Sequence, residues 1–379
     1  MKRIAVITGT RADYGIYKSV LKNISINREL ELSLIVVGMH LSEEFGCTVK
    51  EIEHDGFRIV EKIGALHNND TNLSMAKSVG LAVTKISSAL AGLKPDILLV
   101  LGDRSEMLAG AIAATYLGLP IAHIHGGDIS GNVDEPVRHA ITKLSHIHFA
   151  ATKESAQRII KMGEEPWRVH VVGAPGLDLI LNRPAFDDHQ MAKKYRLDLD
   201  KPLIIVLQHS VVTEADEASN QILETLEAVK EIGCQTIIIY PNADAGGRRM
   251  IEVIKKYEIL PFIKTFESLP HEDYLGLMKI ASVMVGNSSS GIIEAPSLDL
   301  PVVNIGSRQI GRQRAGNVVD IGYSKEEIVR EIRKLLKQTN KPRLSRISLY
   351  GDGKAGERVA KILGIIKIDE KLILKRMAY

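Results

Sequence analysis

The chain alternates between short apolar runs and longer segments with helical periodicity. An apolar run such as KRIAVITG or DILLVLGD is followed by a turn and then by a segment such as SEMLAGAIAATYLG. Strands with few polar residues, separated by helices, are typical of a parallel sheet that helices cover on both faces. In the first half the apolar runs are residues 2–9, 31–38, 96–103, 119–127, 146–152 and 169–175. The first half therefore predicts one such sheet.

A polar segment separates this half from a second one. It lies near residues 176–200, includes LNRPAFDDHQMAKKYRLDLDKP with its two prolines, and predicts a linker with a short helix. The alternation then restarts with the apolar runs 202–210, 235–242, 260–266, 282–289 and 300–307. We predict two doubly wound, Rossmann-like α/β domains, residues 1–180 and 181–365. We expect residues 366–379 to form a tail that packs back on the first domain.

Composition narrows the class of protein. A chain of 379 residues suits two domains, and 45% apolar with 25% charged residues is typical of a soluble globular protein. The net charge of +3 is close to balance and gives no support for nucleic-acid binding, which requires a concentrated basic face. No segment approaches the ~18 apolar residues of a membrane span, and the N-terminus is typical of a strand, not of a signal peptide. We expect a cytoplasmic protein with no membrane partner.

Polar groups gather where the predicted strands end. In open α/β sheets, ligands bind at the carboxyl ends of the strands. The segments at those ends are GTRADYG, GDRSE, HIHGGDISGNVDE, QHSVVTE, YPNADAGGRR, GNSSSGIIE and NIGSRQIGR. Because charged, imidazole and hydroxyl groups recur at the same end of most strands, we predict a ligand cleft between the two domains.

Two of these segments suggest contacts to a phosphate. GNSSSGIIE places Ser288, Ser289 and Ser290 at a predicted helix N-terminus, where unpaired N–H groups favour an anion; capping of that helix is the alternative. Glu294, an acceptor, suits a pair of hydroxyls such as those of a ribose. The NIGSRQIGR segment adds Arg308 and Arg312 and favours the anion.

GTRADYG follows the first strand and lacks the G-x-G-x-x-G fingerprint of dinucleotide sites. Arg11 and Asp13 suit a substrate with both phosphate and hydroxyl groups. An Arg–Asp pair within a surface turn is the alternative.

The acid–base candidates follow other strands. Asp103 ends a strongly apolar strand, so we expect burial to raise its pKa; capping of the next helix is the alternative. His209 ends the first strand of the second half and is expected to face the cleft. His123, His125, Asp128, Asp134 and Glu135 fall within thirteen residues, but no tight Cys/His pattern accompanies them. We therefore expect no metal.

Taken together and in order from Arg11 to Arg312, these segments, with RHAITKLSH, resemble the hydrolysing UDP-N-acetylglucosamine 2-epimerases. The resemblance implies a fold of the glycosyltransferase-B type, with a UDP-sugar in the interdomain cleft. It implies release of UDP with inversion at C2, through elimination to 2-acetamidoglucal and addition of water, to give N-acetylmannosamine. It also implies that no cofactor is needed and that the protein is a homodimer or homotetramer.

The resemblance assigns roles to individual residues. The implied catalytic residues are Asp103, His125, Asp134 and His209. The predicted UDP-sugar ligands are Arg11, Asp13, Arg104, Asn242, Tyr274, Ser288, Ser289, Glu294 and Arg308.

One departure concerns His125, because well-known members of the family carry a glutamate there. Either His125 or a neighbour such as Asp128 then takes the proton-transfer role. The substrate also stays open, since relatives with similar motifs act on UDP-2,4-diacetamido-2,4,6-trideoxyglucose, which favours a less polar sugar pocket. A UDP-sugar glycosyltransferase, a non-hydrolysing epimerase and a two-lobed sugar-binding protein are the rival functions.

Overall fold

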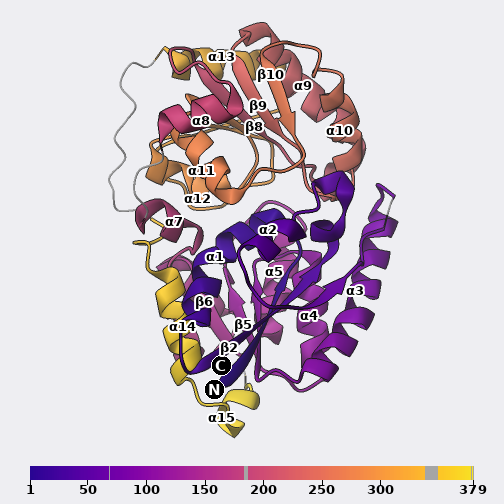
Figure 1. Cartoon of the computed structure of the whole chain (residues 1–379), viewed down its shortest axis with the longest axis vertical. Helices are drawn as coiled ribbons and strands as arrows, with labels where there is room; N and C mark the ends of the chain where they lie inside the picture. Colours follow the sequence, from indigo (N-terminus) through magenta and orange to yellow (C-terminus); the bar gives the residue numbers. More distant parts are fainter. Residues whose placement is uncertain (68, 183–186, 338–348, 377, 379) are drawn as a thin grey trace.

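Each half of the chain forms its own parallel sheet, and the two sheets occupy the two lobes of the computed structural model (Figure 1). The structure describes residues 1–67, 69–182, 187–337, 349–376 and 378. Within this part of the chain, the first sheet has seven strands and the second has six. The prediction of two doubly wound α/β domains is thus confirmed.

The first sheet has the strand order β3-β2-β1-β4-β5-β6-β7, and every neighbouring pair is parallel. Its central strands are buried along their whole length because helices cover both faces. The strands are β1 Lys2–Thr8, β2 Leu30–Val37, β3 Ile59–Ile63, β4 Ile97–Leu101, β5 Ile121–Ile124, β6 Ile147–Ala150 and β7 Val169–Val171.

Side-chain caps fix where several helices of this lobe begin. Thr10 accepts a hydrogen bond from the Asp13 N–H at 3.3 Å, and Thr71 accepts one from the Ser74 N–H at 3.2 Å. The helices are α1 Arg11–Ser25, α2 Val49–His54, α3 Asn72–Leu93, α4 Ser105–Tyr116, α5 Asp134–Leu144, α6 Lys153–Lys161 and α7 Gly176–Asn182. Among the described helices of the whole chain, none has both the length and the apolar character that crossing a membrane requires.

The second sheet repeats this topology with the order β10-β9-β8-β11-β12-β13, again parallel throughout. Its strands are β8 Leu203–Leu207, β9 Gln235–Ile239, β10 Ile263–Phe266, β11 Val283–Gly286, β12 Val302–Ile305 and β13 Val318–Ile321. The helices that follow β7 are α8 Asp188–Tyr195, α9 Ala218–Ile232, α10 Gly247–Lys255, α11 His271–Ile280, α12 Ser290–Ile293, α13 Lys325–Leu336, α14 Ala355–Ile365 and α15 Glu370–Ile373. Part of the predicted linker, residues 183–186, lies outside the described residues.

Two of the four edge strands, β3 and β13, are absent from the predicted set of apolar runs. Both are only partly buried, and β3 exposes Glu61 and Lys62 near its middle. An edge strand pairs on one side only and tolerates polar residues, so its sequence lacks the continuous apolar run of a central strand.

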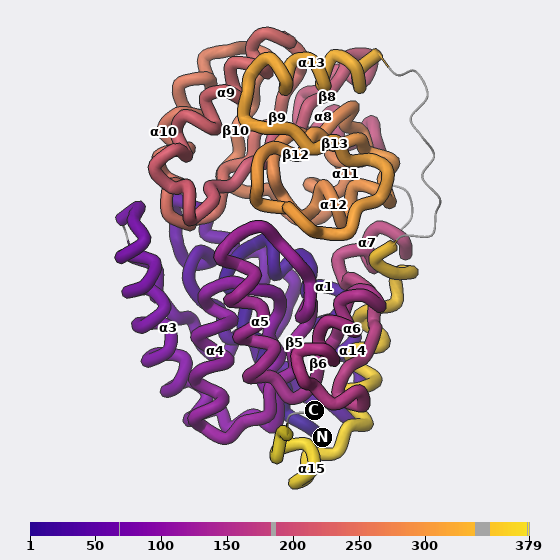
Figure 2. The backbone as a smooth tube through the Cα atoms, turned by 180° about the vertical axis from the view of Figure 1, so that it is seen from behind, coloured from indigo at the N-terminus to yellow at the C-terminus, as the bar shows by residue number. Residues whose placement is uncertain are grey.

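The C-terminal segment crosses back to the first lobe, where both ends of the chain lie (Figure 2). The predicted boundary assigned residues 355–365 to the second domain, but α14 packs against α1, and its Val359 and Leu363 belong to the core of the first sheet. That assignment was wrong, because the apolar face of α14 fits the first lobe. In the tail, Leu372 is buried in the same core, and its carbonyl accepts a hydrogen bond from Arg168 at 2.8 Å.

Candidate active site

A cleft lies between the carboxyl edges of the two sheets. In each sheet the strand order reverses at a central pair, β1 with β4 and β8 with β11, and a crevice opens outside the strand ends at such a point. Two adjoining pockets of the cleft share Thr10, His209, Asn242, Ser288 and Ser289. All the predicted site residues line these pockets: Arg11, Asp13, Asp103, Arg104, His125, Asp134, His209, Asn242, Tyr274, Ser288, Ser289, Glu294 and Arg308.

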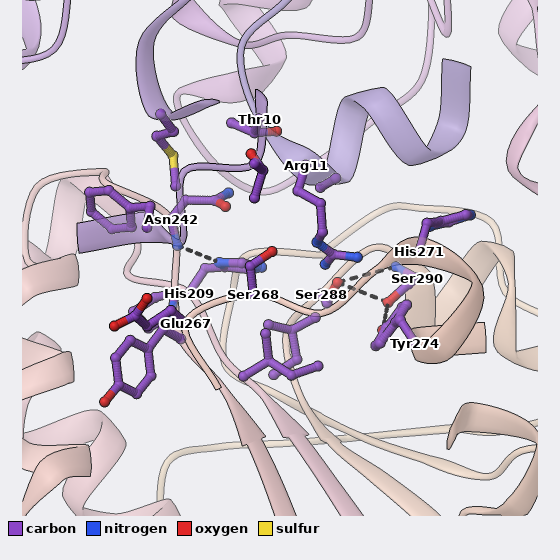
Figure 3. Close-up of a pocket in the computed structure, with 18 of the residues that line it drawn as sticks. Thr10, Arg11, His209, Asn242, Glu267, Ser268, His271, Tyr274, Ser288 and Ser290 are labelled. Atoms are coloured by element: carbon purple, nitrogen blue, oxygen red, sulfur yellow. Dashed lines mark hydrogen bonds between the residues drawn. The ribbon is translucent and has the colours of Figure 1, made fainter. Parts of the chain in front are cut away.

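The turn after β1 directs Arg11 into the cleft. The Asp13 carboxylate accepts hydrogen bonds from the N–H groups of Gly9 at 3.0 Å and Thr10 at 2.8 Å. The Arg11 guanidinium lies 5.5 Å from the centre of the Tyr274 ring, and its buried Nη1 has no hydrogen-bond partner among the described residues (Figure 3). Asp13, predicted as a substrate ligand, is therefore engaged in shaping the turn. Arg11 is the group left to meet an anion.

The serine turn after β11 differs from the prediction. Gly286 has φ of 133°, and a Cβ there would lie 2.2 Å from the Leu207 carbonyl oxygen, so only glycine fits. The predicted helix is a single turn, α12, followed by a 3₁₀ segment that begins at Ala295, and its N-terminus therefore contributes little dipole. The capping alternative holds only in part, because the Ser289 side chain makes no capping hydrogen bond, whereas the Ser288 hydroxyl accepts a long hydrogen bond from the Ser290 N–H at 3.4 Å.

Hydroxyl groups, and not a helix N-terminus, are the groups of this turn that are suited to bind an anion. The Ser288 and Ser290 hydroxyls lie 3.0 Å apart, and Ser290 also pairs with the Tyr274 hydroxyl (Figure 3). The turn thus presents hydroxyl donors close to the Arg11 guanidinium. An anion held here would be bound by these side chains and not by a helix dipole.

Glu294 lies behind this turn as a buried carboxylate. Its Oε2 has no hydrogen-bond partner among the described residues, and burial raises the pKa of the group to about 7. Nearby His125 and Arg312 lower that pKa only in part. A buried acceptor without a partner is costly, so the site is suited to a ligand that brings hydroxyl donors.

Glu294→Gln is expected to stabilise the ligand-free protein at pH 8 but not at pH 5. The folded pKa of about 7 exceeds the ordinary value of 4.5, so wild-type stability falls as pH rises through that window. Because glutamine does not ionise, the variant avoids this loss, and its free energy of unfolding at pH 8 should exceed that of the wild type by at most about 3 kcal/mol. Thermal unfolding at both pH values measures this difference in stability. Glu43→Gln is the control, because Glu43 is exposed and its substitution also removes one negative charge. An equal gain at both pH values would contradict the ionisation argument.

Asp103 and Asp134 lie together among arginines. Burial disfavours the charged form of Asp103, but Arg138, Arg312 and Arg308 outweigh burial and lower its pKa. The expected raised pKa was therefore wrong for Asp103. Asp103 pairs with the fully buried Arg138, and the N-cap residue of helix α4 is Arg104, which makes no side-chain capping bond. The capping alternative for Asp103 is therefore excluded.

Asp134 has the raised pKa instead. Burial and the neighbouring charge of Asp103 raise it to about 6, although Arg308 lies 3.3 Å away and lowers it. The site therefore holds one carboxylate that stays ionised and one that exchanges its proton near neutral pH. Such a pair suits general acid–base chemistry, in which the two groups need different protonation states.

His209 is a neutral hydrogen-bond donor toward the cleft. Burial and the arginines 308, 104 and 11 hold the pKa of its imidazole well below the ordinary value. Its Nδ1 accepts the N–H of Asn242 at 3.2 Å, so the ring proton is on Nε2 (Figure 3). Asn242 belongs to the loop between β9 and α10, and Asp244 of the same loop pairs with Arg104 of the first lobe at 3.4 Å.

His125 and Asp128 occupy the turn after β5. His125 has φ of 62°, and its Nδ1 lies 3.1 Å from Asp128. The neighbouring His123 has a structural role, because its Nε2 lies 2.7 Å from the Gly102 carbonyl oxygen and its Nδ1 lies 3.2 Å from the Thr142 hydroxyl. The two histidines therefore do not form a pair in the cleft.

Comparison with known proteins shows to which family the chain belongs. The family model for UDP-N-acetylglucosamine 2-epimerase matches residues 22–364. The chain belongs to this epimerase family. It is 41% identical over 379 residues, the full length of both chains, to the UDP-N,N'-diacetylbacillosamine 2-epimerase (hydrolyzing) of Legionella pneumophila. It is 36% identical over 328 residues, 86% of each chain, to the UDP-N-acetylglucosamine 2-epimerase of Neisseria meningitidis.

Solved structures of the epimerase family share the fold. The crystal structure of a UDP-GlcNAc 2-epimerase from Neisseria meningitidis bound to UDP-GlcNAc superimposes with a TM-score of 0.77 at 19% identity. The match covers 96% of this chain and 99% of that chain. The predicted relation to hydrolysing 2-epimerases and the glycosyltransferase-B type of fold are thus confirmed.

Arg138 was not among the predicted site residues of this family member, and Arg312 was expected only as part of the segment that favours an anion. Arg138 donates to the carbonyl of Asp128 at 2.9 Å and pairs with Asp103, while Arg312 donates to the Ile129 carbonyl at 3.3 Å. The spacing in the sequence could have placed Arg138 in the site, because Arg138 follows Asp134 by four residues and the two therefore share one face of a helix. Nothing in the sequence indicates that Arg138 pairs with Asp103.

Proposed function

We propose that this epimerase hydrolyses a UDP-2-acetamido sugar with inversion at C2, and that its preferred substrate is UDP-2,4-diacetamido-2,4,6-trideoxyglucose, the UDP form of N,N'-diacetylbacillosamine. The observation that carries the choice of sugar is an apolar wall beside the carboxylates. UDP-N-acetylglucosamine, which the sequence resemblance put first, is the second candidate.

The apolar wall comes from three helices of the first lobe. On α3, Asn72, Met75, Ala76 and Val79 are spaced i, i+3, i+4 and i+7, so they share one face, and all four line the pocket that contains Asp103 and Asp134. The other apolar members of the wall are Leu108 of α4 and Val133 and Val137 at the start of α5.

A wall of this kind suits a sugar with a methyl group at C6 and an acetamido group at C4. Methyl groups gain free energy when they leave water for an apolar surface. Hydroxyls at C4 and C6, as in UDP-N-acetylglucosamine, would lose water there without a matching partner. Asn72 at the end of the α3 face offers an amide that can pair with the second acetamido group. The Legionella relative, named for this sugar, points to the same choice.

The other end of the cleft supports a UDP site. Arg11, the serine hydroxyls and Arg308 suit a diphosphate, and Glu294 suits the two ribose hydroxyls. Tyr274 offers an aromatic ring beside this part of the cleft. Donors and cations placed where the leaving group gains charge lower the barrier to its departure.

The reaction requires one proton to leave C2 and another to return. In the elimination, a base takes the C2 proton, its electron pair forms the C1–C2 double bond, and the C1–O bond breaks to release UDP. In the hydration, the oxygen of water bonds to C1 and an acid protonates C2 on the opposite face. Asp134, His125 and Asp103 are the ionisable groups beside this pocket, and the His209 N–H is a donor for an oxygen at the anomeric centre.

Incubation with each UDP-sugar alone tests the proposal. Mass spectrometry and NMR of the products should show UDP and a free sugar inverted at C2, with higher kcat/KM for the diacetamido substrate. Solvent deuterium should appear at C2. An intact UDP-sugar with inverted C2 would indicate a non-hydrolysing epimerase, and product only after an acceptor is added would indicate a glycosyltransferase. Binding of UDP-sugar with no product would indicate a sugar-binding protein.

Val79→Asn is expected to lower kcat/KM for the diacetamido substrate by about 10-fold, a typical effect of one disturbed apolar contact in a pocket. The polar amide disrupts the α3 face, whereas UDP alone should bind unchanged. Leu73→Asn is the matched control, because Leu73 lies on the same helix, is 64% exposed and does not line the pocket. Equal effects of the two substitutions would show that the pocket-lining face of α3 does not contribute to recognition of the sugar.

A further inference from the structure

We infer that Asp128 is a positioning residue that keeps the proton of His125 on Nδ1, so that the bare Nε2 of His125 exchanges the proton at C2 of the substrate. This inference rests on the proposed function and resolves the choice between the two residues. His125 is then the group that replaces the glutamate of other family members.

Asp128 lines the pocket, but neighbouring side chains already engage its carboxylate. Its Oδ1 accepts the Ser155 hydroxyl at 2.7 Å, and its Oδ2 lies 3.1 Å from His125 Nδ1. Arg138 holds the backbone of the same residue through the Asp128 carbonyl at 2.9 Å. Both carboxylate oxygens are thus engaged, and the side chain is only 5% exposed.

The charge of Asp128 decides which nitrogen of His125 carries the proton. Burial disfavours the carboxylate, but the contact with His125 and the arginines 312 and 138 outweigh burial and lower its pKa. An ionised carboxylate can only accept hydrogen bonds, so Nδ1 must donate. The lone pair of the neutral ring is then on Nε2, for which the described residues provide no hydrogen-bond partner.

The backbone turns this ring toward the cleft. The positive φ of His125 is rare for a residue with a side chain and persists only where its surroundings fix it. The His125 N–H donates to the Phe149 carbonyl at 3.0 Å, and a Cβ on Gly127 would lie 2.3 Å from the Ser155 carbonyl oxygen. This close packing of the turn on α6 is what brings the Ser155 hydroxyl within reach of Asp128.

The arrangement has the features of a proton acceptor with a fixed orientation. When Nε2 takes the C2 proton, the C–H electron pair forms the double bond and the diphosphate departs with the electrons of the C1–O bond. The imidazolium that results lies against the Asp128 carboxylate, which stabilises it. Asp134, with its pKa of about 6, is suited to return a proton to C2 in the hydration.

Asp128→Asn tests the positioning role with a readout that needs no substrate. With the Asn oxygen held by Ser155, the amide N–H₂ faces Nδ1 and favours the opposite tautomer. The ¹⁵N NMR spectrum of histidine-labelled, ligand-free protein, assigned with His125→Gln, should show Nδ1–H in the wild type and Nε2–H in the variant. We expect kcat to fall by about 10–100-fold, the usual cost of losing a group that orients a functional residue, with little change in UDP affinity. Ser155→Ala should keep the wild-type tautomer and lose less activity, because the carboxylate remains.

Three results would overturn the inference. The first is a wild-type spectrum with the proton on Nε2, and the second is an Asp128→Asn enzyme with an unchanged tautomer and unchanged kcat. A changed tautomer with unchanged kcat would remove His125 from the proton transfer. If the wild type releases no UDP from either sugar, the proposed function fails. The wild-type spectrum still decides whether Asp128 positions His125, even if the variant does not fold.

Discussion

Asp103→Asn is expected to lower kcat by about 10²–10⁴-fold, the usual contribution of a group that acts in proton transfer. Asp103 is held ionised by Arg138, Arg312 and Arg308 at the end of β4, beside Asp134. Asparagine keeps the shape but removes the charge that raises the pKa of Asp134. The substitution therefore affects two groups at once, and steady-state kinetics with the preferred UDP-sugar measure the loss.

The same substitution should also reduce stability. Arg138 is fully buried and would lose its charged partner, at a cost of up to about 3 kcal/mol. The double variant Asp103→Asn with Arg138→Met removes the unpaired buried charge but also the bond from Arg138 to the Asp128 carbonyl, so it should recover only part of the lost stability and none of the activity. Thermal unfolding separates the two effects, and calorimetry should show UDP binding retained in the single variant. Unchanged turnover would remove Asp103 from the mechanism.

Arg308→Ala is expected to lower kcat/KM by about 10²–10³-fold, as for a donor aimed at developing charge, and to weaken UDP binding. The guanidinium donates to the Asn287 carbonyl at 3.2 Å and to Asp134 at 3.3 Å, while its buried Nε has no partner among the described residues. It thus holds the turn that carries Ser288, and its Nε–H is left to donate to an anion. Calorimetry with UDP and steady-state kinetics measure the two losses.

The pH–rate profile of this variant provides an independent readout. Arg308 lowers the pKa of Asp134, which is about 6 with the arginine in place. Without Arg308 that pKa rises further, so the limb of the profile that belongs to Asp134 should move to higher pH. Arg308→Lys keeps the positive charge and should leave the limb near its wild-type position. An unmoved limb in Arg308→Ala would show that Asp134 does not control the rate.

The ionisation and the hydrogen-bond partners of the carboxylates were the hardest features to predict from the sequence. Asp103 follows a strand of five buried residues, and burial alone raises a carboxylate pKa, yet Arg138, 35 residues away, reverses the sign. Asp13 stands in a motif that suits a ligand contact, but the N–H groups of its own turn engage the carboxylate. For Asp103 the decisive neighbour comes within hydrogen-bond distance only when the chain folds. For Asp13 the contact is a local capping box with Thr10, which competes with the ligand interpretation of the same motif.

The sequence by itself determined the two parallel sheets, the family and the position of the cleft. Continuous apolar runs can be buried only as central strands between helices, and parallel strands bring the motifs that follow them to one edge. Tertiary structure alone decided the place of α14, the edge strands β3 and β13, and the ionisation of Asp103 and Asp134. It also decided the contact between Asp128 and His125 and the position of α3 beside the pocket that contains Asp103 and Asp134. These features depend on which surfaces and charges meet across long sequence separations, and local patterns do not encode such contacts.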